Sequence, residues 1–134
     1  MLDWLRKKKE APLTGAPAVR RQKTYSAESG YVYQYFYEGQ RAAIRSGAAG
    51  SQYVFNVSAD RKFSSFVSVF LSEDVLDTWQ TEHARQLGST ERYAVAKMAL
   101  FQAFDRRSAP SEMTEEVRVE AGDIESILAT LDIS

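Results

Sequence analysis

Apolar and polar residues alternate along the first half of the chain, most clearly over residues 31–37. Four tyrosines share one face of this stretch, while Val32, Gln34 and Phe36 share the other. A period of two is typical of a β-strand with one buried face. The same pattern predicts strands over 52–58 and 63–71. A short strand over 41–45 is expected after a turn at 38–40, and 46–51 reads as a loop.

The apolar spacing changes to three and four residues after Ser72, which indicates helices. Ser72 and the two acidic residues that follow it are favourable at a helix start. We predict one helix over 73–87, ended by Gly88, and a second, more buried one over 91–107. An edge strand over 116–120 and a last helix from Asp123 complete the chain.

Strands that precede helices are typical of the α+β class. Short connections between neighbouring strands favour antiparallel pairing. We therefore expect a four- to five-stranded, mainly antiparallel sheet, arranged as a meander. Two long helices are expected on one face, together with a C-terminal helix. In this arrangement the helices would pack on one face of each of two strands. That face carries Tyr53, Phe55 and Val57 in the first strand, and Val67, Val69 and Leu71 in the second.

The formal net charge of −1 conceals an uneven distribution. Residues 1–24 hold seven basic and two acidic side chains, and the rest of the chain holds ten basic and sixteen acidic ones. Proline and glycine among small residues over 11–30 are typical of a linker. We expect a flexible basic tail and linker over 1–28 and a single α+β domain over 29–134. Removal of 1–28 should then leave the melting temperature nearly unchanged.

The first residues of the tail are amphipathic, with apolar side chains ahead of a basic cluster. Such a segment can attach to an anionic membrane surface, although only reversibly. Docking on an acidic protein surface and a simple solvated tail are the alternatives. The tethering residues would be Leu2, Trp4, Leu5, Arg6, Lys7, Lys8 and Lys9.

Composition excludes several kinds of chemistry. The 134 residues include no cysteine and one histidine, so disulfide scaffolds, thiolate metal sites and polyhistidine sites are excluded. No glycine-rich phosphate loop or serine-nucleophile motif is present, and no cofactor or metal is expected. His83 follows Trp79 by four residues, which favours a histidine packed on the indole over a general base. The lack of cysteine and of a secretory signal favours the cytoplasm.

One pair of short motifs resembles a known family. Arg41-Ala-Ala-Ile-Arg45 and the later Asn56-Val-Ser58 look like the paired motif of the PilZ domains, which bind cyclic di-GMP. The resemblance implies that Arg41 and Arg45 grip phosphate and guanine, and that Asn56 and Ser58 complete the pocket. The sequence departs from that family where Arg61 replaces an expected glycine, and where helices follow in place of further strands.

The preferred hypothesis is a small, non-enzymatic, cytoplasmic protein-interaction or adaptor domain that self-associates. Helices can cover one face of the sheet, which leaves Phe36, Val54, Phe66 and Phe70 on the other. An apolar patch of this kind needs a cover, either a second subunit in a homodimer or the last helix. The alternative is a nucleotide- or nucleic-acid-binding domain that uses Arg41, Arg45 and the sheet tyrosines. The acidic body makes nucleic acid the weaker partner.

Overall fold

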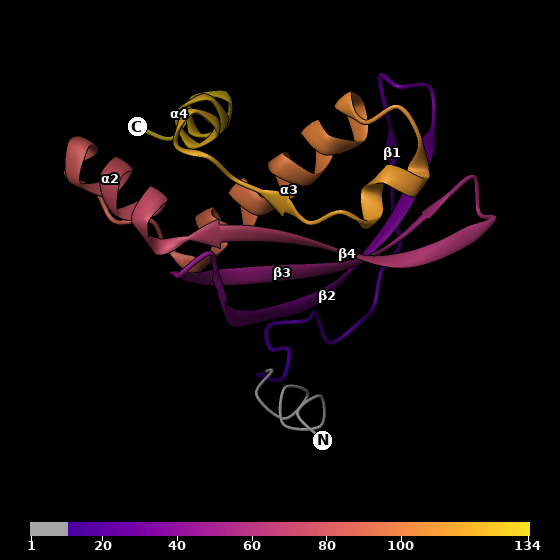
Figure 1. Cartoon of the computed structure of the whole chain (residues 1–134), viewed down its shortest axis with the longest axis horizontal. Coiled ribbons are helices and arrows are strands. Elements are labelled where there is room, and N and C mark those ends of the chain that lie inside the picture. Colours follow the sequence, from indigo (N-terminus) through magenta and orange to yellow (C-terminus); the bar gives the residue numbers. More distant parts are fainter. Residues whose placement is uncertain (1–10) are drawn as a thin grey trace.

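The computed structural model describes residues 11–134, apart from the side chain of Phe63. The elements in chain order are β1 (Lys23–Ser26), β2 (Val32–Arg45), β3 (Ala48–Ala59), β4 (Phe63–Ser72), α2 (Glu73–His83), α3 (Ser89–Arg106), the 3-10 helix η1 (Pro110–Thr114), β5 (Val117–Arg118) and α4 (Ala121–Thr130). Figure 1 shows one curled sheet, a half-barrel, with α3 lying across its concave side. The predicted α+β class is confirmed.

The five strands follow one another in the sheet in sequence order. Strands β1 to β4 pair antiparallel, as the predicted meander requires, and the two-residue β5 pairs parallel with β4. The predicted strand over 63–71 therefore matches β4 closely, and the edge strand predicted over 116–120 is present as β5.

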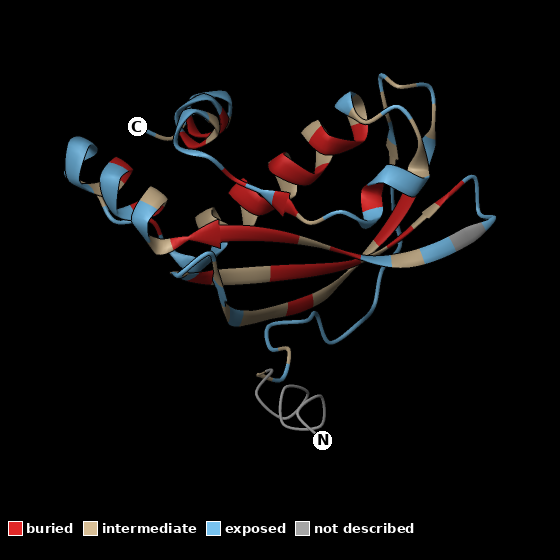
Figure 2. Ribbon diagram, in the orientation of Figure 1, coloured by how far each residue is buried: buried red, intermediate tan, exposed pale blue. Residues whose placement is uncertain are grey.

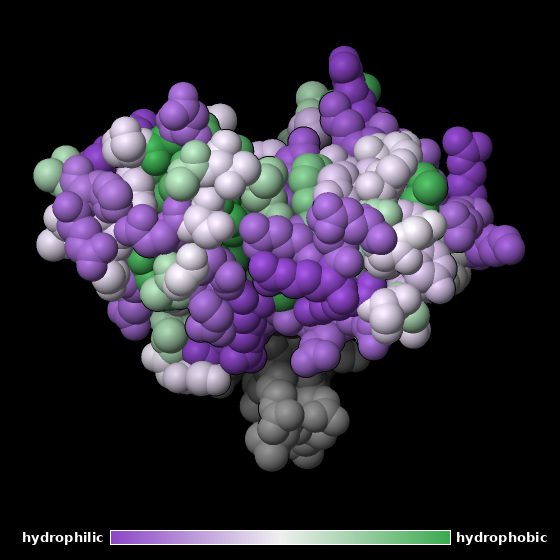
Figure 3. All heavy atoms as spheres, turned by 90° about the horizontal axis from the view of Figure 1, so that it is seen from above, coloured by the Kyte–Doolittle hydropathy of each residue, from purple (hydrophilic) through white to green (hydrophobic). Residues whose placement is uncertain are grey.

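The core lies between the concave face of the sheet and the helices (Figure 2). The inward series of β3 and β4 are buried there, which confirms the predicted orientation of these two strands. Helix α3 carries the largest buried set, as its nearly continuous apolar surface predicted: Val95, Ala96, Ala99, Leu100, Ala103 and Phe104. Viewed from the helix side, the outer surface is mainly hydrophilic, and apolar residues form small separate patches (Figure 3).

Helix α2 begins as predicted but ends early. The Ser72 hydroxyl accepts a hydrogen bond from the Val75 amide at 3.2 Å. The helix ends at His83, because Ala84 adopts the left-handed conformation with φ 50° and ψ 42°. The predicted end near Gly88 is wrong by four residues, since a left-handed alanine leaves no sequence signal comparable to a glycine.

The turn predicted at residues 38–40 is a β-bulge within one long strand. Strand β2 runs without interruption from Val32 to Arg45, and Glu38 is the extra residue where the register with β3 shifts. Gly39, with φ 126°, permits this geometry. Thr14 exchanges two backbone hydrogen bonds of 2.8 Å with Gln40 just beyond the bulge. The loop predicted over 46–51 is also largely strand, because β3 begins at Ala48.

The segment predicted as linker contains a strand of the sheet. Residues Lys23–Ser26 form β1 and pair with Val32–Tyr35 of β2. The Tyr25 ring stacks on Phe101 with 4.3 Å between ring centroids. Composition alone suggested flexibility for these residues, but their contacts hold them on the domain.

Helix α4 packs on the same side of the sheet as the other helices. Its residues Ile124, Ile127 and Leu128 are buried in the main core beside α2 and α3. The last helix therefore does not cover the convex face, and that alternative is wrong. Between residues 11 and 134, no helix combines the length and apolar character needed to cross a bilayer.

Candidate functional site

The convex face of the sheet holds the residues predicted as an interface. Val54 and Phe70 are buried, and Phe36 is half-buried beneath the Arg20 guanidinium, which lies 3.9 Å from its ring centroid. Phe66 differs from them, with 66% of its surface exposed. The apolar patch on this face is therefore smaller than the sequence suggested and centres on one ring.

The residues of the PilZ-like motifs lie on this convex face and mostly bind neighbouring protein groups. The Arg45 guanidinium donates to both oxygens of Glu116 at 2.7 and 3.2 Å. The Arg41 Nε donates to Gln52 at 2.8 Å, and the Ser58 hydroxyl to the Gln34 side chain at 3.3 Å. Asn56 is half-buried opposite Phe36. The core tyrosines occupy the other face of the sheet, so the alternative site of arginines and tyrosines is not assembled.

Glu116 is the centre of a polar network that the sequence did not reveal. Besides Arg45, it accepts hydrogen bonds from the Ser68 hydroxyl at 2.7 Å and from the Gln52 amide at 3.0 Å. Burial would raise the pKa of Glu116, but the hydrogen bonds from Arg45, Ser68 and Gln52 together hold it below its usual value. This network ties the segment before β5 to the outer side of β2, β3 and β4.

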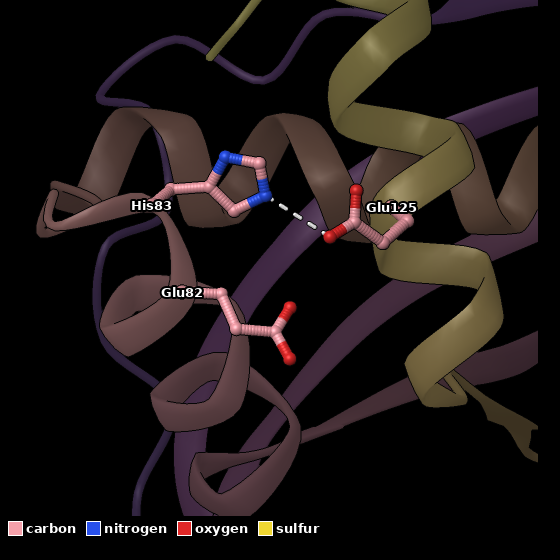
Figure 4. A group of neighbouring side chains, drawn as sticks. All are labelled: Glu82, His83 and Glu125. Atoms are coloured by element: carbon pink, nitrogen blue, oxygen red, sulfur yellow. Dashed lines mark hydrogen bonds and ion pairs between the residues drawn. The ribbon is translucent and has the colours of Figure 1, made fainter.

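His83 lies where α2 meets α4 (Figure 4). Its ring stacks on Trp79 with 4.2 Å between centroids, which confirms the predicted packing. Its Nε2 lies 3.0 Å from Oε1 of Glu125, a partner 42 residues away that no local pattern indicates. Glu82 completes a group whose ligand atoms lie within 4.8 Å of one another, a geometry that a divalent cation could use. All three residues are exposed, and the His83–Glu125 contact already serves to join the two helices.

One pocket opens on the concave side, where the N-terminal segment passes the edge of the half-barrel. Its volume is about 700 Å³. One wall comes from the chain between Thr14 and the first residue of β1, where alternate residues line the pocket: Gly15, Pro17, Val19, Arg21 and Lys23. The segment is fixed at one end by the Thr14–Gln40 hydrogen bonds and at the other by the pairing of Lys23 with Tyr35.

The other walls come from β2 and from the start of α3: Tyr35, Tyr37, Gln40, Ser89, Thr90 and Tyr93. We call the whole cavity the tyrosine pocket. The rings of Tyr37 and Tyr93 lie 4.6 Å apart, centroid to centroid, and join the strand wall to the helix wall. Among the described tyrosines, only Tyr25 donates its hydroxyl to another residue, so the three pocket hydroxyls are available to a ligand.

The charged side chains among the described residues that line the tyrosine pocket are positive. Arg21 and Lys23 line it, and Lys97 lies beside it, with Nζ 5.9 Å from the Tyr35 ring centroid. Within the described part of the chain, none of these three cations forms an ion pair with a carboxylate. No aspartate, glutamate or histidine is among the lining residues that the structure describes.

Burial acts on the titrating groups of the pocket in a consistent way. It raises the pKa of Tyr35 to about 12, and it also raises the pKa of Tyr37 and Tyr93. The tyrosines therefore stay neutral hydrogen-bonding groups at physiological pH. Burial, with a smaller contribution from nearby Lys23, lowers the pKa of Lys97.

Comparison of the chain with protein-family models, with curated proteins and with solved structures found no match. The resemblance to the PilZ domains therefore gains no support from them. The tethering residues Leu2, Trp4, Leu5, Arg6, Lys7, Lys8 and Lys9 lie outside the described residues, and their attachment to a membrane surface stays a prediction.

Sequence reasoning identified part of the tyrosine pocket and missed the rest. It noted the tyrosine stripe of β2 and assigned it correctly to the core face. It missed the wall formed by residues 15–23, because their proline, glycine and small residues indicated a linker. It also missed Tyr93 and Lys97, which are one helical turn apart on α3.

Proposed function

We propose that this protein is a non-enzymatic binding domain whose ligand is a small organic molecule held in the tyrosine pocket. The observation that carries the proposal is the pocket of about 700 Å³ lined by three tyrosines with available hydroxyls. Ligand pockets have volumes of about 300–1,000 Å³ and combine aromatic walls with a few polar groups. The tyrosine pocket has both properties.

The chemistry of the lining supports binding rather than catalysis. General acid–base catalysis near neutral pH needs a group that titrates there, such as histidine or a perturbed carboxylate. Within residues 11–134, neither a histidine nor a carboxylate lines the pocket, and burial raises the pKa of its tyrosines further above neutrality. Its hydroxyls and cations suit reversible recognition, which is consistent with an adaptor whose interactions respond to a ligand. A cytoplasmic location is part of this proposal, and the absence of cysteine supports it.

A pair of matched substitutions tests the proposal. Thr90 lines the pocket at the exposed start of α3, so Thr90→Trp should fill the cavity without disturbing the core. Thr130→Trp adds the same ring at the exposed end of α4 and serves as the control. The neutral dye N-phenyl-1-naphthylamine and its sulfonated analogue are titrated by fluorescence. We expect one saturable site for at least one dye in the wild type and in Thr130→Trp, and its loss in Thr90→Trp. Equal binding by all three proteins, or none by the wild type, would overturn the proposal.

Self-association through the convex face is a second candidate function. The observation that favours it is Phe66, whose large apolar ring is exposed in the middle of β4. Single exposed apolar residues are common on monomers, so Phe66 by itself supports a modest contact. The two candidates use opposite faces of the sheet and are therefore compatible. A mass measurement in solution tests the second one.

A further inference from the structure

We infer that the ligand of the tyrosine pocket is an organic anion with a flat, apolar body, whose charged group is held by Arg21, Lys23 and Lys97. This inference rests on the proposed function and specifies its ligand class. Two independent features of the pocket support it: the surplus of cations and the arrangement of the rings.

The surplus of cations favours an anion. The chain as a whole is slightly acidic, and most ion pairs of the described residues join an arginine to a glutamate. The three cations at the pocket have no such partner within residues 11–134. Lys97 is half-buried, and its burial, together with a smaller repulsion from the nearby Lys23, lowers its pKa. A bound anion would neutralise this repulsion, so it would bind more tightly than a neutral molecule of the same shape.

The arrangement of the rings favours a flat body for the ligand. Tyr37 and Tyr93 contact each other, with 4.6 Å between ring centroids, and form one continuous aromatic wall on which a ligand could lie. Tyr35 lies on the strand side, with the Lys97 Nζ 5.9 Å from its ring centroid. Aromatic walls gain most from a planar partner that can stack on them or meet them edge to face. The first residues of α3, Ser89 and Thr90, add hydroxyls and the positive end of the helix to the same cavity. Hydroxyls and cations therefore surround a mainly aromatic space.

The matched dyes that test the proposed function also test this inference. N-phenyl-1-naphthylamine is neutral, and 8-anilinonaphthalene-1-sulfonate has the same rings with one sulfonate. We expect the sulfonate to bind the wild type about tenfold more tightly or better, a factor that one or two charge-assisted contacts supply. Added salt should reduce this preference, since part of it is electrostatic attraction near the surface.

Lysine variants identify the cations responsible. In Lys97→Gln and Lys23→Gln the preference for the sulfonate should fall by about three- to tenfold, while the neutral dye binds as before. Lys62→Gln removes an exposed cation from the turn between β3 and β4 and should change neither dye. Adenosine monophosphate and 2-naphthoate, used as competitors, distinguish a phosphate-bearing from a carboxylate-bearing ligand. Inorganic phosphate alone should compete poorly, because it lacks the flat body.

The two failures are distinguishable. If neither dye binds in the pocket, the proposed function fails. If both bind there with equal affinity, or if the lysine variants leave the sulfonate preference intact, the pocket is a binding site but the inference of an anionic ligand is wrong.

Discussion

Glu116 shows how one side chain can organise a surface. Three donors from three different strands converge on its carboxylate: Arg45 of β2, Gln52 of β3 and Ser68 of β4. Its side chain keeps 18% of its surface exposed, so the hydrogen bonds are only partly weakened by water. Hydrogen bonds to a charged group contribute more to stability than neutral ones, and a buried group left unsatisfied is costly.

We predict that Glu116→Gln lowers the free energy of unfolding by about 1.5–3 kcal/mol at pH 7. The pKa of Glu116 is lower in the folded protein than its ordinary value. The carboxylate therefore stabilises the fold fully above the ordinary glutamate pKa, and this stabilisation is lost as pH falls through the folded pKa. The difference between wild type and variant should shrink correspondingly on acidification. Urea unfolding at pH 7 and at low pH measures both effects.

The neighbouring Glu115 provides the control. It is exposed, and Glu115→Gln should leave stability nearly unchanged at both pH values. A loss in Glu116→Gln that is the same at both pH values would show that the carboxylate charge is not the source of the stabilisation.

The residues of the candidate site were only partly accessible to sequence reasoning, and the reason is distance along the chain. The tyrosine stripe was found because its period of two lies within seven residues. Lys23 and Lys97 are brought together by the fold, and neither has a local pattern that marks it. The same holds for His83, whose stacking on Trp79 followed from helical spacing and whose contact with Glu125 did not.

At the scale of elements, strand β1 attaches the N-terminal segment to the rest of the domain. Its Tyr25 ring stacks on Phe101, and its hydroxyl donates to Asp105 at 2.8 Å. The following loop is also held by α3, because the Glu28 amide donates to Asp105 and the Ser29 hydroxyl to the Phe104 carbonyl. Strand β1 thus closes the edge of β2 and covers one side of α3.

We predict that deletion of residues 1–28 lowers the melting temperature by about 5 °C or more relative to deletion of residues 1–22. The longer deletion removes Tyr25 and exposes the hydrogen-bonding edge of β2, whereas the shorter one keeps β1. This replaces the expectation from composition that residues 1–28 are dispensable. Thermal unfolding of both truncated proteins, followed by circular dichroism, measures the difference. Tyr25→Ala in the full chain should reproduce most of it, and equal melting temperatures would show that β1 adds little.

Elements with strong periodicity were predictable, and those defined by backbone geometry were not. Strand β4 and the start of α2 follow from alternation and from a serine cap. The bulge at Glu38 and the helix end at Ala84 depend on unusual backbone conformations. A glycine after a glutamate is also found in ordinary turns, and alanine usually continues a helix, so the sequence did not indicate either feature. The four residues of β1 are too few to show a period. The predicted sheet of four to five strands nevertheless agrees with the five observed strands. Two errors cancel, because β1 was missed and β2 was predicted as two strands separated by a turn at residues 38–40.

At the scale of the whole molecule, the sheet separates two surfaces of different character. The concave side is filled by the helices, and the tyrosine pocket opens at its margin. The convex side has no helix among the described residues and carries the Glu116 network together with Phe66. A ligand in the pocket would contact β2, β1 and α3 at once. Strand β2 also contributes Phe36 and Arg45 to the opposite face.

We predict that the whole molecule self-associates through the convex face of its sheet. Val54 and Phe70 are already buried within one chain, so Phe66 is the main apolar group that a second copy could cover. We therefore expect a dimer that dissociates on dilution, because such an area is smaller than that of an obligate interface. Light scattering across a concentration series should show a mass that rises above 15.1 kDa. Phe66→Glu should remain a monomer throughout, since the contact would bury an unpaired carboxylate. Ser126→Glu adds the same charge on α4, on the other side of the molecule, and should associate like the wild type. A monomer mass for the wild type at every concentration would rule out the dimer and leave Phe66 as an ordinary exposed side chain.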